Sequence, residues 1–376
     1  MVESGERGSG GASMSREGRR SRRWPGTLMR CALALCLSQS AAASPKSVET
    51  SAAVVVEYSE AVDLFNFLDN LADWLPGYTS PVYKTFWEQQ FGLGQDDLKA
   101  LAGYAAFRVR TTRLADSDPA KLDDRIFAVS FDPSADPLSG YFATSSTFDG
   151  ALERALQNQS PGDQALLRDY YARFLPRAQA LVKVRARFVS QTSAVKSELA
   201  DPKTGELVQG MRGFFGVTPP PAFRANFVWW PDPESTQAKV RGSHILLFSP
   251  GDGASGAAAM DWTPIVMHEL AHYFSSRQSQ EKKQDLARRF LAWCPQAGGL
   301  RNPLNAVEEP LAIYWGQYLF EKVVRGQELD PASAWYVQPA ADRGPKHIAL
   351  RFPADKQAPQ LGDEILRAAA EACDKR

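Results

Sequence analysis

Two histidines and a glutamate at a fixed spacing give the strongest chemical signal in the sequence. His268, Glu269 and His272 form the pattern His-Glu-x-x-His within Val266–Phe274. Residues four apart lie on one face of an α-helix, so both imidazoles can reach the same metal ion. Neutral imidazole is a good zinc ligand, and Glu269 can stand beside the open coordination position without being a ligand. There it would accept a proton from a water molecule that the metal activates.

The flanking residues predict the helix that this spacing needs. Thr263 suits an N-cap, and Pro264 suits the first helical position. The chain contains four histidines in all, so an accidental match to the pattern is uncommon. An apolar set then supplies a surface that can be buried against a sheet: Ile265, Val266, Leu270, Ala271 and Phe274. These flanks are too apolar for a solvent-exposed helix, so we interpret the segment as the helix of a zinc site.

A catalytic zinc usually has three protein ligands, so a third must come from elsewhere. One known continuation of the motif needs Gly at 275 and His at 278, but the chain has Ser275 and Gln278. The other common solution is a glutamate on a later helix. Asn305–Phe320 begins with Glu308 and Glu309 and is otherwise apolar. A carboxylate is costly to bury there unless a cation meets it, although the helix dipole could also stabilise the pair.

The motif helix resembles that of the zincin metallopeptidases, and the glutamate segment is similar to that of the gluzincins. Glu309 is followed by Pro310 and, three places on, by Ala312, as in the gluzincin pattern. The resemblance extends to secreted bacterial members of this group and covers about a quarter of the chain, from a strand before the motif to this helix. Glu308 is the rival candidate, either as the third ligand or as an outer partner that orients a histidine.

The resemblance implies a zinc-dependent peptidase with Zn²⁺ held by His268, His272 and Glu309. Glu269 would be the general base, and the substrate would be a peptide or protein. The implied fold class is α+β and zincin-like, mostly helical, with a small antiparallel or mixed sheet beside the motif helix. An edge strand in such enzymes binds the extended substrate, and Gly242–Phe248 is similar in placement, although an ordinary core strand would have the same pattern.

Other polar residues could take part, but spacing selects none of them. A donor for the developing oxyanion is expected, and the available side chains are His244, Tyr314, Tyr336 and His347. Glu281 and Asp285 are nearer the motif but lie in a stretch typical of a solvated helix face, so both are weak candidates.

The rest of the chain reads as helices followed by strands. Val54–Arg110 is mainly helical in pattern. Helices are predicted at Ala61–Leu75, Val82–Phe91, Asp96–Arg108, Pro161–Val189 (kinked or broken at Pro176) and, as one or two helices, Gln191–Phe215. Arg125–Phe131 could be a strand, and Asp132–Ser139 reads as a loop. After the proline run at 219–221, strands are predicted at Ala222–Trp230 and Ala238–Phe248. The chain thus divides into residues 1–43, a helical region 44–218 and a zincin-like catalytic region 219–376.

Residues 1–43 read as a signal peptide. Several arginines precede the apolar run Cys31–Leu37, and Ala41 and Ala43 fit the small-x-small cleavage rule. A disordered basic tail is the alternative. Cleavage would leave Cys294 and Cys373, either as a disulfide in an oxidising compartment or as two thiols. We therefore predict export to the periplasm or the outside.

Charge and hydrophobicity argue against nucleic acid as a partner and against a membrane span. The 43 basic and 43 acidic residues balance. The first 43 residues hold seven Arg and three Glu, so the remainder has 36 basic and 40 acidic side chains without blocks. This gives no footprint for nucleic acid, and no downstream run is long enough for a membrane span. Two alternatives to a peptidase stay open: a non-catalytic zinc-holding binding or envelope-assembly protein on a zincin scaffold, or an accidental motif that binds no zinc.

Overall fold

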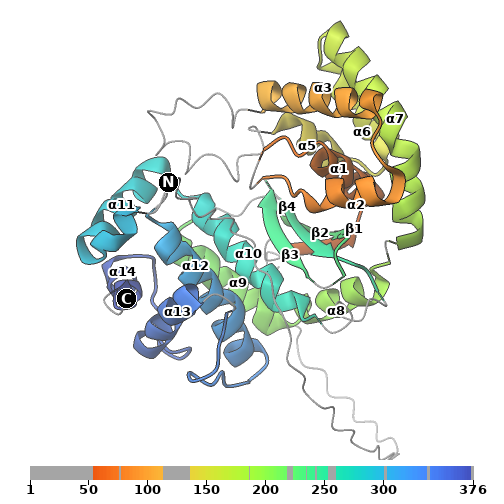
Figure 1. Ribbon diagram of the computed structural model, residues 1–376. Coiled ribbons are helices and arrows are strands. Elements are labelled where there is room, and N and C mark those ends of the chain that lie inside the picture. The colour runs from red at the N-terminus through yellow and green to blue at the C-terminus, as the bar shows by residue number, and fades with distance from the viewer. Residues whose placement is uncertain are drawn as a thin grey trace, which may run out of the picture.

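The computed structural model describes residues 54–75, 78–112, 136–185, 187–217, 223–233, 235–241, 244–252, 260–299, 303–336 and 339–373. Within these residues the protein is mostly helical and has one small mixed sheet, the α+β architecture that the sequence predicts (Figure 1). The helices are α1 (Glu60–Leu71), α2 (Val82–Phe91), α3 (Gln95–Thr111), α5 (Pro137–Ala143), α6 (Phe148–Gln157), α7 (Pro161–Arg185), α8 (Val189–Leu199), α9 (Pro202–Phe215), α10 (Trp262–Ser276), α11 (Gln280–Trp293), η4 (Pro295–Gly299), α12 (Asn305–Ile313), the π-helix η5 (Tyr314–Val324), α13 (Pro339–Arg351) and α14 (Asp363–Ala370).

The sheet combines strands that are far apart in the sequence. Its strands are β1 (Val54–Tyr58), β2 (Phe223–Trp229), β3 (Gln237–Arg241) and β4 (His244–Ser249), in the spatial order β1-β2-β4-β3. β2 is parallel to both β1 and β4, whereas β3 is antiparallel to β4. Both sides of the expected boundary near residue 218 therefore contribute to one sheet. The proline run that marks this boundary lies outside the described residues.

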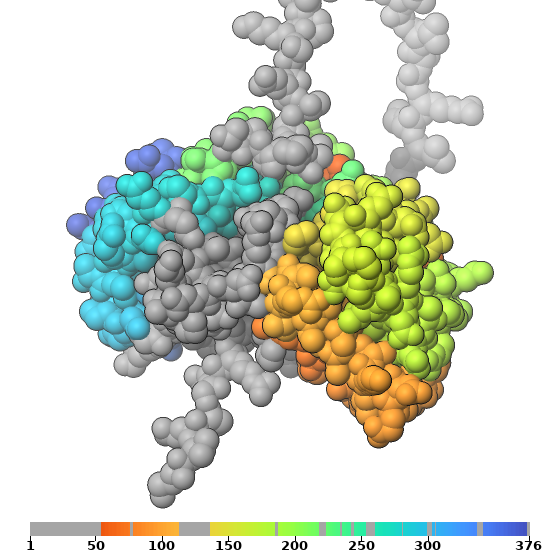
Figure 2. Space-filling view, turned by 90° about the horizontal axis from the view of Figure 1, so that it is seen from above, coloured from red at the N-terminus to blue at the C-terminus, as the bar shows by residue number. Residues whose placement is uncertain are grey.

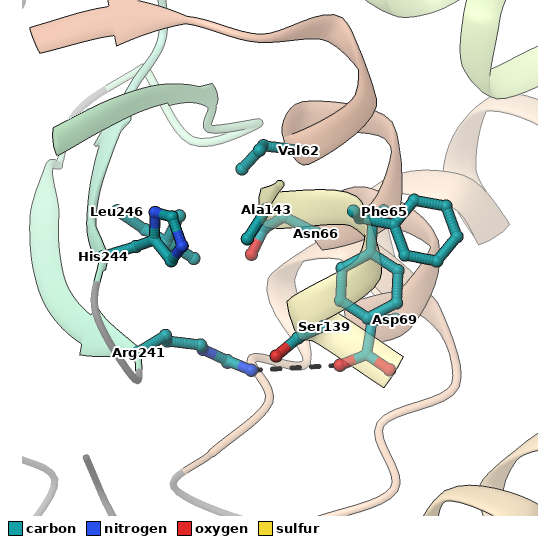
Figure 3. A pocket seen from close by; sticks show the side chains of 10 residues that line it. Val62, Phe65, Asn66, Asp69, Ser139, Ala143, Arg241, His244 and Leu246 are labelled. Carbon is teal, nitrogen blue, oxygen red and sulfur yellow. Dashed lines mark ion pairs between the residues drawn. The ribbon is translucent and has the colours of Figure 1, made fainter. Parts of the chain in front are cut away.

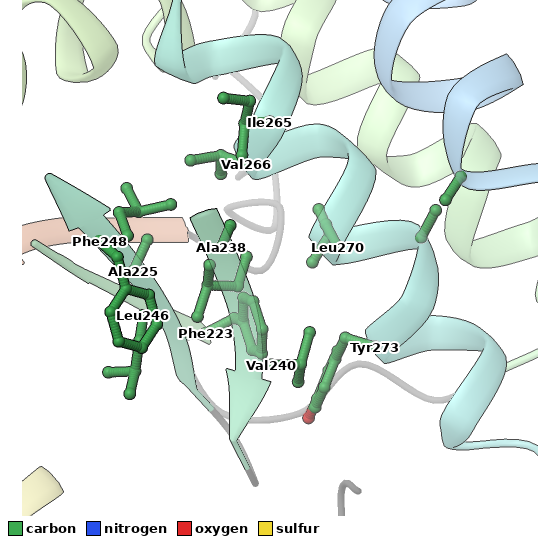
Figure 4. Close-up of a cluster of buried hydrophobic side chains, with 14 of the residues drawn as sticks. Phe223, Ala225, Ala238, Val240, Leu246, Phe248, Ile265, Val266, Leu270 and Tyr273 are labelled. Atoms are coloured by element: carbon green, nitrogen blue, oxygen red, sulfur yellow. The ribbon is translucent and has the colours of Figure 1, made fainter. Parts of the chain in front are cut away.

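Helices cover both faces of the sheet. Figure 1 shows α1, α2 and α5 on one side of it and α8, α9 and α10 on the other. Figure 4 shows apolar side chains of α10 facing those of the strands: Ile265, Val266, Leu270 and Tyr273 opposite Phe223, Ala225, Ala238 and Val240. The rings of Phe223 and Tyr273 are 4.1 Å apart between centroids. Seen from above, the helices of the N-terminal region (orange to yellow-green) lie on the opposite side from α10 and α11 (cyan) (Figure 2). Burial of this apolar surface fixes α10 on the sheet.

The strands correct the sequence prediction in two places. Val54–Tyr58 is strand β1 rather than helix, because its run of three valines favours a pleated surface and pairs with β2 along its whole length. The predicted strand Ala238–Phe248 is two strands, β3 and β4, folded back on each other. His244–Phe248 is paired on both sides, so the edge position expected for Gly242–Phe248 is wrong. The edge strand beside α10 is β3.

Most helices lie where the sequence predicts them. Val82–Phe91 is α2 with the same bounds, and α1 and α3 differ from prediction by a few residues at their ends. The pattern at Gln191–Phe215 gives two helices, α8 and α9. Gly216 ends α9 with a φ of 66°, a left-handed conformation that glycine adopts without strain.

One loop prediction was wrong, and one strand prediction is not tested. Of the two alternatives at Pro176, a kink or a break, the break is excluded, because α7 continues through this proline. Pro137–Ala143 forms α5 although the sequence predicts a loop through Ser139. Asp136 caps this helix by accepting a hydrogen bond from the Ser139 N–H at 3.2 Å, which offsets the weak local propensity. The predicted strand Arg125–Phe131 lies outside the described residues.

A buried ion network holds the N-terminal helices together and reaches the sheet. Arg108 on α3 is fully buried and pairs with Asp69 at 2.6 Å and with Asp136 at 2.7 Å. Arg241, at the end of β3, lies 3.9 Å from Asp69, and its guanidinium carbon is 3.8 Å from the ring centre of Tyr78. A buried charge is stable only while its partners stay in place. The network therefore fixes the edge strand β3 onto the N-terminal helices.

A small cavity lies beside this network, between the sheet and the helices α1 and α5 (Figure 3). Its wall is mainly apolar, and Arg241 and His244 project into its sheet side. Arg241 follows Val240 in the strand, so the two side chains point to opposite faces of the sheet. Because Val240 faces α10, the cavity lies on the face away from α10.

A disulfide joins Cys294, at the end of α11, to Cys373, just after α14. Of the two cysteine states that the sequence left open, the structure thus has the paired one.

In the described part of the chain, no helix is both long and apolar enough to cross a bilayer. The predicted signal peptide, residues 1–43, lies outside the described residues.

Candidate metal centre

α10 presents His268 and His272 on one face, as their spacing predicts. The helix begins at Trp262 and its N-cap is Asp261, so the predicted N-cap at Thr263 is wrong. Asp261 forms an ion pair with Arg325 at the end of η5, and an acid at this position also complements the helix dipole. These contacts fix the start of the helix and hence the direction of its two imidazoles.

α12 brings a glutamate to the two imidazoles. Glu309 places Oε1 at 3.5 Å from Nε2 of His268 and Oε2 at 3.1 Å from Nε2 of His272. Glu308 points elsewhere and accepts a hydrogen bond from the Ser275 hydroxyl at 2.8 Å. Consecutive residues of a helix point about 100° apart, so one of the two carboxylates faces the imidazoles and the other does not. The structure brings Glu309 to the histidine pair.

The spacing of these donor atoms fits a tetrahedral zinc ion. The Nε2 atoms of His268 and His272 are 3.2 Å apart, and one donor from each of the three residues lies within 4.8 Å of the others. Zinc holds nitrogen and oxygen ligands at about 2.0–2.1 Å, which sets neighbouring donors about 3.3 Å apart in a tetrahedron. Two imidazoles and one carboxylate are also a ligand set that zinc accepts. His268, His272 and Glu309 therefore fit the ion by type and by distance.

The charges at the centre are those of a site suited to a cation. Burial lowers the pKa of His268 to about 4. Burial also disfavours a charge on His272, but the hydrogen bond and the negative charge of Glu309 raise its pKa to about 9. Burial works against the Glu309 carboxylate too, yet the two imidazoles hold its pKa well below the usual range. A proton on His272 thus balances Glu309 in the metal-free chain, and a metal ion would displace that proton.

Glu269 is buried beside these groups and faces the sheet edge. Burial, reinforced by the charge of Glu309, raises the pKa of Glu269 to about 7, against the opposing effects of His272 and Lys239. The backbone N–H of Val240, on β3, donates a hydrogen bond to its carboxylate. The edge strand therefore orients a carboxylate that can exchange a proton near neutral pH, which is what a general base requires.

Three of the four side chains considered as oxyanion donors lie away from the centre. Tyr314 donates its hydroxyl proton to the carbonyl of Phe352, His347 pairs with Glu371, and His244 borders the cavity on the far face of the sheet. The weaker acidic candidates are on α11, where Glu281 is exposed and Asp285 pairs with neighbouring arginines.

Tyr336 is the member of that group that reaches the centre. Its ring is nearly parallel to that of His268, with centroids 6.0 Å apart, and its hydroxyl hydrogen-bonds with Glu309. The segment that carries it is anchored by Asp342 on α13, whose Oδ1 accepts the backbone N–H of Trp335 at 2.6 Å and of Tyr336 at 3.0 Å. Tyr336 thus helps to hold Glu309 in place.

Sequence reasoning missed two residues of η5 that contact the motif helix. A Cβ on Gly316 would lie 2.5 Å from the backbone nitrogen of His268 and 2.6 Å from its Cα, so glycine lets the two helices meet at the ligand. Gln317, which is 8% exposed, follows it and interacts with the His268 imidazole. The available signal was a Gly-Gln pair among the large apolar and aromatic residues at the start of η5, where a glycine and a polar side chain each need a structural reason.

Comparisons with protein-family models, with curated proteins and with solved structures found no match. The interpretation of this centre therefore depends on its own residues.

Proposed function

We propose that this protein is a zinc-dependent hydrolase of peptide bonds, of the gluzincin type. Zn²⁺ would be held by His268, His272 and Glu309, and Glu269 would be the general base. The observation that carries the proposal is the convergence of three metal-ligating side chains from two helices, within 4.8 Å, next to a buried carboxylate. A zincin-like fold is part of the same proposal, because the motif helix lies beside an edge strand that could pair with an extended peptide.

The residues of the centre would divide the chemistry between them. When bound, zinc supplies a Lewis acid that polarises the scissile carbonyl and lowers the pKa of the attacking water. Glu269 would take a proton from that water and pass it to the leaving amine, a role that a carboxylate buried beside the three ligands can fill. The Val240 N–H keeps the Glu269 carboxylate in place, and Tyr336 does the same for Glu309.

Export to the periplasm or the outside is proposed with this function. The disulfide between Cys294 and Cys373 supports it, because disulfides persist mainly in oxidising compartments. A peptidase that acts there would meet exported or environmental peptides.

One observation favours a second function, a zinc-holding binding or envelope-assembly protein without catalysis. Glu269 is 5% exposed and His268 is 2% exposed, so the described side chains leave a substrate little access to the base. Such a protein would bind zinc through the same three residues and would not turn over peptides.

Bound zinc per chain, measured by elemental analysis, tests the ligand set. We expect about one zinc per chain in the wild type, its loss in Glu309→Ala, and its retention in Glu269→Gln. Glu308→Ala is the matched control, because it removes the neighbouring carboxylate, which bonds to Ser275 instead. A correctly folded wild type that stays empty when offered zinc would overturn the proposal, and zinc loss in Glu308→Ala would move the third ligand by one residue.

Turnover of a mixed peptide library separates the two functions. For a peptidase, Glu269→Gln keeps its zinc and loses about a hundredfold or more in kcat/KM, the usual contribution of a positioned base. If the zinc-loaded wild type cleaves no peptide in the library, the zinc-holding function replaces the peptidase.

A further inference from the structure

Two buried polar side chains, His268 and Gln317, interact at the contact between α10 and η5. Nδ1 of His268 and Oε1 of Gln317 are both buried, and neither completes a hydrogen bond with any residue that the structure describes. The two side chains are nevertheless close enough to interact as hydrogen-bonding groups. A buried polar atom without a partner costs free energy, so a pair of them needs a reason.

The backbone dictates that these two side chains meet. Gly316 lets η5 approach so closely that any larger residue would collide with the main chain at His268. The next residue, Gln317, then lies beside the imidazole, and η5 is a π-helix, a form often found at functional sites. The other ring nitrogen of His268, Nε2, faces His272 at 3.2 Å and Glu309 at 3.5 Å. Nε2 therefore faces the metal site, which leaves Nδ1 as the ring nitrogen available to Gln317.

We propose that Gln317 is a positioning residue that accepts the Nδ1 proton of His268 and so leaves Nε2 free to bind zinc. This inference rests on the proposed function, because it assigns a role toward the same ion. The amide suits the task because it accepts a hydrogen bond without adding charge. Glu269, Glu308 and Glu309 already bring three carboxylates to this region, and a fourth would have to be buried with them.

The test compares zinc affinity in matched variants, measured by competition with a chromogenic chelator. Gln317→Met keeps the length of the side chain and removes the acceptor, and we expect zinc affinity to fall about ten- to a hundredfold. Gln317→Glu restores an acceptor at the cost of a further negative charge, which bound zinc would balance, so it should recover most of the loss. Gln278→Met is the control, since Gln278 is also buried but lies just after the C-terminal end of α10, where it donates to the Phe215 carbonyl.

Two further readouts separate positioning from general damage. Thermal unfolding of the metal-free proteins should be similar for Gln317→Met and Gln278→Met, while zinc affinity falls in the first alone. The visible spectrum of the Co²⁺-substituted protein should change in Gln317→Met and be restored in Gln317→Glu, because it reports the geometry of the ligands.

The possible results test the role of Gln317 separately from the proposed zinc centre. If the wild type binds one zinc that Glu309→Ala removes, and Gln317→Met binds it equally tightly, the role of Gln317 is wrong and the metal centre stands. If Gln278→Met lowers zinc affinity as much as Gln317→Met does, the effect is one of stability and the role of Gln317 is again wrong. A wild type without zinc overturns both proposals together.

Discussion

The buried carboxylate of Asp63 should make the stability of this protein fall as the pH rises. Asp63 lies on α1 and accepts the backbone N–H of Trp229 at 2.7 Å. Burial raises its pKa from 3.8 to about 7. Between those values the folded state holds a proton that the unfolded state has released, so the free energy of unfolding decreases with increasing pH, by about 4 kcal/mol at most.

Asp63→Asn should remove this dependence, because the amide stays neutral and can still accept the Trp229 N–H. In urea denaturation of the metal-free protein, the gain of the variant over the wild type should be larger at pH 8 than at pH 5. Asp355→Asn, at an exposed position, controls for the loss of one charge. A difference between variant and wild type that is the same at both pH values would contradict the prediction.

At the scale of single residues, the sequence predicted those parts of the metal centre whose geometry follows from local spacing. His268, Glu269 and His272 share one helix, so their relative positions follow from the helical repeat. The choice between Glu308 and Glu309 needed the rotation of α12 about its axis, which the contact with Ser275 shows. Tyr336 and Gln317 reach the centre through long-range packing, and no spacing in the sequence encodes that.

At the scale of elements, the contact between α10 and η5 depends on Gly316. Gly316→Ala would place a methyl group 2.5 Å from the backbone nitrogen of His268, so one helix must move. We expect a loss of about 1–3 kcal/mol in the free energy of unfolding, as for other overpacked sites. Zinc affinity should fall as well, because the displaced backbone carries a ligand. Chemical denaturation and the chelator competition measure the two effects.

Gly213→Ala on α9 is the matched control for this substitution. A Cβ there has no neighbour within 4 Å, so alanine should stabilise the helix by about 0.5–1 kcal/mol through its better helix propensity. Opposite signs for the two variants would show that the close approach, and not helix propensity, governs Gly316. If Gly316→Ala is as stable as the wild type, this packing argument fails.

The elements that the sequence predicted well have strong local patterns, and the others depend on distant partners. α2 and α9 carry clear stop signals: α2 has the predicted bounds, and α9 ends at Phe215 as predicted. β1 was missed because it has five residues and its partner, β2, is more than 160 residues away in the chain. The break between β3 and β4 was missed because the alternating residues of β3 run on into the apolar residues of β4, and pattern alone does not show a reversal of direction.

At the scale of the whole molecule, one sheet unites the parts of the chain that the sequence divided near residue 218. β1 pairs with β2, and the Tyr83 hydroxyl on α2 donates to the Trp229 carbonyl at 2.8 Å. The Arg108 network then ties the N-terminal helices to the end of β3, next to the strand residue that bonds to Glu269. The N-terminal region therefore supports the edge strand of the metal centre, which composition alone did not suggest.

The disulfide acts at the same scale, because it closes a long loop that contains about half of the C-terminal region. Cys294 and Cys373 are 79 residues apart, and the loop between them includes Glu309, Gln317 and Tyr336. Closing a loop of this length restricts the unfolded chain and stabilises the folded one by about 4 kcal/mol in the chain-entropy account.

The double variant Cys294→Ala, Cys373→Ala should therefore unfold at a clearly lower urea concentration than the oxidised wild type. The reduced wild type should match the double variant, and a reductant should leave the double variant unchanged, which controls for the cysteines of the first 43 residues. Equal midpoints for the oxidised and reduced wild type would mean that packing between α11 and α14, and not the covalent link, holds this region together.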